Sequence, residues 1–358
     1  MSPIILLVLA LSACAFPFMS AGTGGPAIFI FGDSTVDVGT NNYIKSVFKV
    51  NHAPYGIDFP GKTATGRYSN GYNTADAIVK KFGLMNSPLP FLAIANKSSL
   101  IVRGANFASG GSGLLDSTGA RSGVVPLSQQ IQQFTVVRNN LNDLLGAAKA
   151  DNLVKKSFVF LSVGSNDMFQ KFFFTRNVTS QEYITQLISA YEDHLQVLYS
   201  LGARKFAISS VPQLGCIPVL RAGNAAGACS DELNNGAQCF YSAIGPMLQN
   251  LKSKLTQMQY ALANSYKLSA VLSNPSSGLQ ELKNACCGGG KFNAQQLCLP
   301  NAAVCPNRDK YLYWDQYHPT QAAAAIVANT LYSGTTEFVT PINFKQLFEA
   351  PLQTKRSF

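Results

Sequence analysis

Residues 27–39 read AIFIFGDSTVDVG, an apolar run that ends abruptly in glycine and polar residues. Consecutive apolar side chains would be buried on both faces of a strand, as in a parallel sheet covered by helices on both sides. Four later runs share this character, which gives expected strands at residues 27–31, 105–108, 157–163, 205–211 and 259–263. The sequence therefore predicts a parallel sheet.

Amphipathic stretches with helical spacing lie between and after these runs. Residues 184–201 carry apolar side chains along one stripe, and residues 233–255 and 321–331 have the same character. Alternating strands and helices indicate a three-layer α/β/α sandwich with right-handed crossovers. In such sheets the active site forms at the carboxyl ends of the strands, so the residues directly after each run are the candidates for function.

Small and polar residues follow three of the expected strands. Ser34 lies on a turn after the first, a glycine-rich turn ending at Gly113 follows the second, and Asn166 follows the third. Near the C-terminus, Asp315 and His318 stand three residues apart in the segment YWDQYHPT. The proline of this segment suits the first turn of a helix, which would place His318 just ahead of one.

These residue types are the parts of an acyl-transfer site. A serine hydroxyl needs a base within hydrogen-bond reach, and the base needs an acceptor that fixes its tautomer. Donors such as a glycine N–H, an asparagine amide and the N–H of Ser34 must face the developing oxyanion. Of the three histidines, His52 lies in a turn-rich loop, and His194 is expected to be a solvated residue of a helix. His318 is therefore the leading candidate for the base.

Four segments, FGDSTVDVG, NFASGGSG, GSND and WDQYHPT, resemble the four blocks of the GDSL esterase/lipase family within the SGNH hydrolase superfamily. The large secreted plant branch is the most similar. The resemblance runs from Ile28 to about Phe348 and includes PYGIDFP–TGRYSNG at residues 54–71. The family often has Leu where Thr35 stands and Asn where Thr40 stands, and neither change removes a catalytic group.

The resemblance implies Ser34 as the nucleophile, His318 as the base and Asp315 as the residue that orients the base. It also implies Asn166 and a glycine of the second block as oxyanion donors. We place this glycine at Gly113, although the glycines at 110 and 111 leave the register open. The implied fold is a flavodoxin-like SGNH hydrolase with about five parallel strands.

The sequence thus predicts a secreted serine esterase or lipase that hydrolyses carboxylic ester bonds of an ester or lipid substrate. The reaction would pass through an acyl-enzyme and use no cofactor and no metal. An extracellular acyltransferase could use the same site with another alcohol as acceptor. A non-catalytic protein that binds cell wall or carbohydrate could keep the fold, but the intact serine, aspartate and histidine argue against it.

The N-terminus predicts export. Residues 4–15 form a nearly continuous apolar run, which is shorter than the about 20 residues of a membrane-spanning helix. Small residues follow, as in a signal peptide cut after Ala15 or Ala21. We therefore expect a signal peptide over residues 1–21, a single hydrolase domain over residues 22–358 and no transmembrane segment.

Glycosylation and charge fit the same compartment. The sequons at Asn96 and Asn177 predict glycans on a protein of the apoplast or cell wall. The chain has 28 Lys and Arg against 18 Asp and Glu, a net charge of +10, and these basic residues are scattered. The absence of a dense basic stripe argues against nucleic-acid binding. Weak electrostatic retention on a polyanionic cell wall is a further hypothesis.

The cysteines favour disulfides over a zinc site, because no Cys-x-x-Cys pair occurs. Seven cysteines follow the predicted signal peptide, and we expect one bridge between Cys216 and Cys229. Two more bridges, in a pairing that the sequence leaves open, are expected among Cys286, Cys287, Cys298 and Cys305. The remaining Cys239 is expected to be free and buried in a helix.

Two acidic residues beside the predicted site have structural interpretations. Asp33 is expected to cap a helix after the first strand, and Asp167 is expected to hold its loop. Four aromatic residues follow the turn at Asn166, namely Phe169, Phe172, Phe173 and Phe174. Core packing is favoured for them, and the alternative is an apolar wall for an acyl chain.

Overall fold

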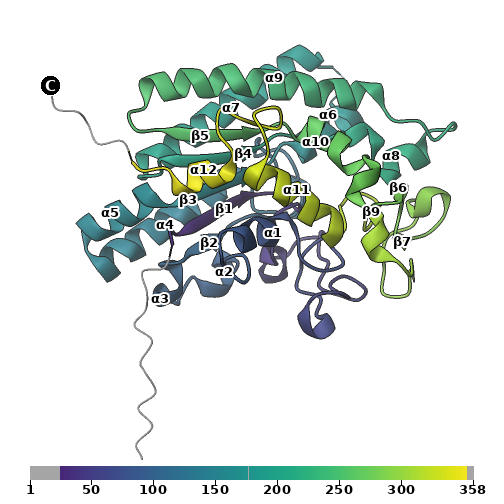
Figure 1. The fold of residues 1–358 in the computed structure, drawn as a ribbon, viewed down its shortest axis with the longest axis horizontal. Coiled ribbons are helices and arrows are strands. Elements are labelled where there is room, and N and C mark those ends of the chain that lie inside the picture. The colour runs from purple at the N-terminus through teal and green to yellow at the C-terminus, as the bar shows by residue number, and fades with distance from the viewer. Residues whose placement is uncertain (1–24, 176, 353–358) are drawn as a thin grey trace, which may run out of the picture.

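The computed structural model describes residues 25–175 and 177–352, so the predicted signal peptide lies outside the described residues. A six-stranded sheet with the order β10-β5-β4-β3-β1-β2 forms the centre (Figure 1). Its strands are β1 (Ile28–Gly32), β2 (Gly104–Asn106), β3 (Phe158–Ser162), β4 (Lys205–Ser209), β5 (Gln259–Ala263) and β10 (Val339–Thr340). The first five are parallel, and β10 pairs antiparallel with β5.

This sheet confirms the predicted fold class. The order of the five parallel strands, 2-1-3-4-5, is that of the flavodoxin-like doubly wound fold. Every expected strand overlaps an observed one, although β1 extends one residue beyond the expected end and β2 starts one residue earlier than expected and ends at Asn106. The sequence did not predict β10, because two residues are too short to show a strand pattern.

Helices cover both faces of the sheet. The helices of the described residues are α1 (Thr74–Lys81), α2 (Phe91–Ile94), α3 (Ser98–Ile101), α4 (Leu127–Leu145), α5 (Ala147–Lys156), α6 (Ser165–Phe174), α7 (Ser180–Ser200), α8 (Pro218–Gly223), α9 (Asp231–Lys254), α10 (Ser265–Leu272), α11 (Gln321–Ser333) and α12 (Phe344–Glu349). No helix of the described residues has the length and apolar character needed to cross a membrane.

The core is divided by the sheet into two apolar layers. Side chains alternate along a strand, so Phe29 and Phe31 of β1 pack with residues of α4, α7 and α9, whereas Ile28 and Ile30 pack with residues of α1, α11 and α12. All four side chains are buried. This arrangement gives the predicted three layers and leaves the carboxyl edge of the sheet to the loops.

A long excursion between α10 and α11 carries four short strands, β6 (Glu281–Ala285), β7 (Cys287–Gly288), β8 (Ala303–Val304) and β9 (Tyr311–Tyr313). Two disulfides, Cys286–Cys305 and Cys287–Cys298, cross-link it, and Cys216–Cys229 forms a third. The structure thus confirms the predicted bridges and resolves the open pairing. The prediction for Cys239 is half wrong: it is free but exposed. Its neighbours Ala237 and Phe240 occupy the buried face of α9.

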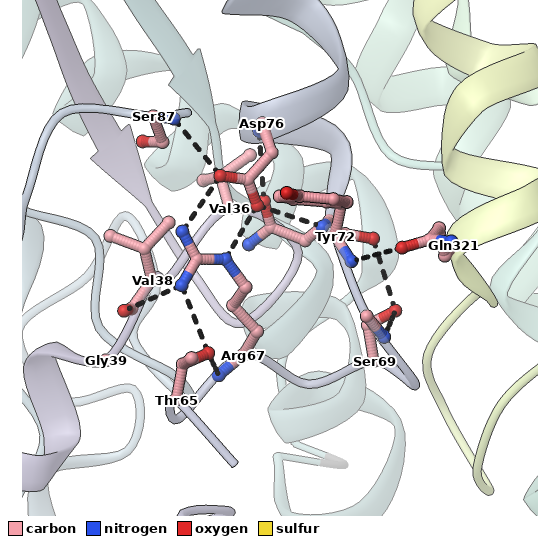
Figure 2. Close-up of polar contacts among 12 residues, drawn as sticks. Val36, Val38, Gly39, Thr65, Arg67, Ser69, Tyr72, Asp76, Ser87 and Gln321 are labelled. Carbon is pink, nitrogen blue, oxygen red and sulfur yellow. Dashed lines mark hydrogen bonds and ion pairs between the residues drawn. The ribbon is translucent and has the colours of Figure 1, made fainter. Parts of the chain in front are cut away.

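Residues 54–72, here called the tyrosine loop, are anchored by a buried ion pair. Arg67 Nε donates to Asp76 Oδ2 at 2.6 Å and its Nη2 donates to Asp76 Oδ1 at 2.8 Å, and both residues are buried. Figure 2 shows this bidentate contact between the loop and α1. The N–H of Tyr72 donates to Oε1 of Gln321, the first residue of α11, at 2.8 Å. The loop is therefore fixed between α1 and α11.

Asp167 has the structural role that was expected, but the loop that it holds is residues 114–118 and not its own segment, which is helical. From the first turn of α6 it accepts hydrogen bonds from the N–H groups of Leu114 and Leu115 at 2.8 and 3.1 Å. The hydroxyl of Thr118 also donates to it, at 2.7 Å. Burial raises the pKa of Asp167 to about 6, since desolvation outweighs these hydrogen bonds.

Asp76→Asn should destabilise the protein by about 3 kcal/mol, because it leaves the buried Arg67 guanidinium without its counter-charge. Urea unfolding of the variant and the wild type measures the difference. Glu337→Gln is the control, since Glu337 and its partner Lys267 are exposed and 3.9 Å apart. An equal loss of stability in both variants would contradict the role of the buried pair.

Asp167→Asn should change how stability depends on pH. With a pKa of about 6 in the folded state and 3.8 as the ordinary value, the folded state binds the proton more tightly. The stability from this group is present below about pH 4 and is lost as pH rises through about 6. Between these pH values, the free energy of unfolding of the wild type, measured in urea, should decline as pH rises. The decline should be less steep in Asp167→Asn, by up to about 1.4 kcal/mol per pH unit.

The exposed Asp193 on α7 provides the matched control for that measurement, as Asp193→Asn. This control should reproduce the wild-type dependence of the unfolding free energy on pH. Identical slopes in Asp167→Asn and the wild type would show that Asp167 does not hold its proton as the burial requires.

Candidate active site

Ser34 projects from a tight turn at the carboxyl end of β1. Gly32, with φ of 145°, approaches β3 so closely that a Cβ would collide with the carbonyl group of Ser162. Asp33 then stabilises the turn, because its Oδ1 accepts hydrogen bonds from the N–H and the hydroxyl of Thr35 at 3.0 and 2.7 Å. The serine is thereby held, partly exposed, at the edge of the sheet.

The expectation that Asp33 caps a helix is wrong, because a single turn follows it. The turn ends where Asp37 Oδ1 accepts hydrogen bonds from the N–H groups of Gly39 and Thr40, each at 2.7 Å. Gly39 has φ of 122°, which no helix accommodates. Burial raises the pKa of Asp33, opposed by its hydrogen bonds with Thr35 and by His318.

Ser34, His318 and Asp315 meet in one chain of hydrogen bonds. The distance from His318 Nε2 to Ser34 Oγ is 2.8 Å, and His318 Nδ1 lies 2.9 Å from both carboxylate oxygens of Asp315. The histidine precedes α11, whose first turn is capped by Thr320: its hydroxyl accepts the N–H of Ala323 at 3.2 Å. The structure therefore brings together the three residues that the sequence singled out as a nucleophile, a base and an orienting acid.

Asp315 is buried and held as an acceptor. Its Oδ1 accepts the N–H groups of Tyr317 and His318, each at 2.9 Å, and its Oδ2 accepts the hydroxyl of Tyr55 at 2.7 Å. Burial alone would raise the pKa of Asp315, but His318 and these hydrogen bonds outweigh it and lower the pKa below its ordinary value. The carboxylate therefore stays ionised at neutral pH.

The loop after β2, residues 107–119 and here called the second-block loop, lies against the start of α6. Asn166 Nδ2 donates one hydrogen bond to the carbonyl of Ser112 at 2.9 Å, which leaves its second N–H for another acceptor. The N–H of Gly110 donates a hydrogen bond to Asp37 Oδ2 at 2.9 Å. The N–H groups of Gly111 and Gly113 have no acceptor within the described part of the chain. Gly111 and Gly113 are therefore the two remaining candidates for the glycine N–H that would face an oxyanion.

The remaining histidines lie outside this hydrogen-bond chain. His52 Nδ1 contacts the carbonyl of its neighbour Ala53 at 2.8 Å. His194 is not the solvated residue that we expected, because it is half-buried with Nε2 3.0 Å from the carbonyl of Leu114. It lies where α7 packs against the loop that Asp167 holds.

The phenylalanines of α6 divide into two groups. Phe169 and Phe172 are partly buried against the core, as core packing predicts. Phe173 and Phe174 are exposed, at 45% and 83%, so core packing is wrong for them. The ring of Phe169 also contacts Tyr317, the residue before His318, with 6.0 Å between centroids.

The tyrosine loop supplies two further residues that the sequence analysis missed. Tyr55 bonds Asp315 as described, and the ring of Tyr68 lies against His318, with 4.8 Å between ring centroids. The sequence showed this segment only as part of the resemblance and gave no role to its tyrosines. An aromatic residue in a glycine- and proline-rich loop, far in sequence from Asp315 and His318, carries no local signal of such contacts.

Comparison with known proteins agrees with this geometry. The family model described as GDSL-like Lipase/Acylhydrolase matches residues 28–331. Among curated relatives from Arabidopsis thaliana, GDSL esterase/lipase At5g55050 is 38% identical over 353 residues, 93% of each chain. GDSL esterase/lipase At5g18430 is 35% identical, covering 89% of this chain and 91% of its own. GDSL esterase/lipase LTL1 is 34% identical, covering 91% and 92%. The chain therefore belongs to the GDSL-like lipase/acylhydrolase family, a family of hydrolases that act on esters.

Proposed function

We propose that this protein is a secreted serine esterase or lipase in which Ser34, His318 and Asp315 are the catalytic triad. The observation that carries the proposal is the continuous hydrogen-bond chain from Ser34 Oγ through His318 to the Asp315 carboxylate. A buried, ionised acceptor on Nδ1 leaves Nε2 as the acceptor of the serine proton. Family membership supports an ester as the substrate.

The reaction proceeds in two steps. Ser34 Oγ attacks the ester carbonyl carbon while His318 Nε2 takes its proton, and the carbonyl becomes a tetrahedral oxyanion. The intermediate collapses, the alcohol leaves with the proton from Nε2, and an acyl-enzyme remains on Ser34. Water then attacks the acyl carbon, gives a proton to Nε2 and releases the acid, after which Ser34 regains its proton. Asp315 holds the imidazole and stabilises the imidazolium in both steps.

The oxyanion donors are proposed to be Asn166, Gly113 and the N–H of Ser34. Asn166 has one amide N–H left after its bond to Ser112, and Gly113 follows Ser112 directly. Gly111 is the alternative glycine, since its N–H has no acceptor in the described residues either. Fixed donors of this kind stabilise the oxyanion because they need no reorganisation when its charge develops.

The acyl chain is proposed to run along α6. Asn166, Phe169 and Phe173 lie at positions i, i+3 and i+7, and therefore share one face of the helix. Phe169 contacts Tyr317, which adjoins the catalytic histidine and is 42% exposed. An apolar chain that leaves the oxyanion site along this face would cover aromatic surface that is now exposed.

Export rests on three observations. The described chain has three disulfides, which persist in oxidising compartments. Both sequon asparagines are exposed, Asn96 between α2 and α3 and Asn177 between α6 and α7. The third observation is the apolar run at residues 4–15, which is typical of a signal peptide.

Ser34→Ala should abolish hydrolysis of a short nitrophenyl ester, with a loss of at least about 10³-fold in kcat, and should leave the fold intact. Ester turnover and thermal unfolding measure the two effects. Ser200→Ala, at the exposed end of α7, is the matched control and should behave as wild type. Comparable turnover by the Ser34 variant would contradict the mechanism. An added alcohol that diverts acyl groups to a new ester would reveal acyl transfer.

Phe173→Ser should lower kcat/KM for long-chain nitrophenyl esters about five- to thirty-fold, which corresponds to about 1–2 kcal/mol of lost apolar contact, and leave short-chain esters unchanged. The measurement is the ratio of kcat/KM values across a chain-length series. Leu144→Ser is the control, because Leu144 on α4 is exposed to a similar extent, 46% against 45%. An unchanged chain-length ratio in folded Phe173→Ser protein would remove α6 from the acyl site.

A further inference from the structure

One side chain outside the proposed triad bonds the triad carboxylate directly. Tyr55 donates its hydroxyl to Asp315 Oδ2 at 2.7 Å across 260 residues of sequence. Within the described residues, the other donors to this carboxylate are His318 itself and the two N–H groups of the turn at Tyr317 and His318. Among these donors, the Tyr55 hydroxyl is thus the one that a substitution can remove without changing the triad or its backbone.

The surroundings of Tyr55 hold its hydroxyl in place and keep it a hydrogen-bond donor. The residue is 7% exposed, and its ring packs edge-on against the fully buried Trp314, with 6.0 Å between centroids. Its N–H donates to the carbonyl of His52 at 3.1 Å. Burial, together with the charge of Asp315, holds the pKa of Tyr55 well above its ordinary value. The phenol therefore stays protonated at neutral pH, where Asp315 is ionised.

The tyrosine loop is tied to the segment that carries Asp315 and His318. Arg308 donates to Asp58 through Nε at 2.6 Å and Nη2 at 2.7 Å, which joins the loop to the chain before β9. Asn70 Oδ1 accepts the N–H of Gln321 at 2.8 Å. Gln321 Oε1 in turn accepts the N–H of Tyr72, as Figure 2 shows. With the Arg67 anchor on α1, these contacts set the position of Tyr55 relative to Asp315.

The geometry points to Tyr55 as a positioning residue that acts through Asp315: it holds the carboxylate facing His318 Nδ1 and shares its negative charge. This inference rests on the proposed function. A carboxylate with fixed partners keeps the imidazole in one tautomer and orientation, which catalysis requires within a fraction of an ångström. Without the phenol, Oδ2 keeps only the imidazole as a donor among the described residues, and the carboxylate becomes a stronger base.

Tyr55→Phe is the direct test. The variant should lose about tenfold in kcat/KM for a short nitrophenyl ester, mostly in kcat, because a hydrogen bond to a charged group is removed. The acid limb of its pH–rate profile should move to higher pH, because a more basic Asp315 favours protonation of the His318–Asp315 pair. A loss of packing alone would not move this limb.

The other titratable groups near the pair are unchanged in this variant. Tyr68 and Tyr317 interact electrostatically with Asp315, and Asp33 interacts with His318. The ring of His52 contacts the ring of Tyr55 edge-on, with 5.4 Å between centroids, and Tyr55→Phe keeps that ring. Burial raises the pKa of Tyr68 and of Tyr317, so neither phenol ionises across the acid limb. A shift between the two profiles is therefore assigned to the lost hydroxyl.

Three further variants are compared with Tyr55→Phe. Tyr191→Phe removes a buried hydroxyl that has no partner in the described residues, and should leave kinetics and pH profile as in wild type. In an Asp315→Asn background, Tyr55→Phe should have almost no further effect on the rate of Ser34 labelling by a fluorophosphonate probe. Replacing Tyr55 with 3-fluorotyrosine, a stronger donor of nearly the same shape, should move the acid limb to lower pH.

Each outcome bears on the inference. An unmoved acid limb in both position-55 variants, or the same fold-loss from Tyr55→Phe with and without Asp315, would overturn it. If Tyr55→Phe does not fold, the fluorotyrosine variant alone decides. Failure of the proposed function would look different: wild-type protein would not be labelled on Ser34, whereas failure of this inference leaves that labelling intact.

Discussion

The 2.8 Å contact between Ser34 Oγ and His318 Nε2 joins two segments that are 284 residues apart. It exists because β1 lies inside the sheet and α11 packs against α1 on the face that also buries Ile28 and Ile30. The doubly wound sheet therefore does more than bury apolar surface. It brings a turn near the start of the domain beside a turn near its end, and the proposed chemistry depends on that meeting (Figure 1).

Buried carboxylates hold the loops around this contact. Asp76 binds the arginine of the tyrosine loop, Asp167 binds three donors of the second-block loop, and Asp37 binds the N–H groups of Gly39, Thr40 and Gly110. Burial raises the pKa of Asp37 and of Asp167 to about 6, so their ionised forms cost stability at neutral pH. The protein tolerates this cost in exchange for loops that hold their residues in place.

The sequence predicted the parts of the molecule that have a local pattern. Apolar runs gave the five parallel strands, and the residues after them gave Ser34, Asn166, Asp315 and His318. Contacts between distant loops have no such pattern, so the roles of Tyr55 and Tyr68 were missed. Cys239 and His194 were assigned the wrong environment, because the face that a helical residue presents depends on which neighbour packs there.

The glycine register shows the same limit on a smaller scale. Three glycines in four residues are equivalent in sequence, and only the contact of Gly110 with Asp37 removes one of them from the candidates. The two-residue strand β10 was likewise decided by a tertiary contact, its antiparallel pairing with β5. Local propensity does not contain this information.

The most direct test of the proposed chemistry is to react the purified protein with a fluorophosphonate probe and to map the labelled peptide by mass spectrometry. A serine whose proton is taken by His318 should form a covalent adduct at Ser34, and prior denaturation should prevent it. Labelling of Ser34 in the folded protein is the expected result. Folded protein that stays unlabelled at Ser34, or is labelled at another serine, would contradict the proposal that Ser34 is the nucleophile.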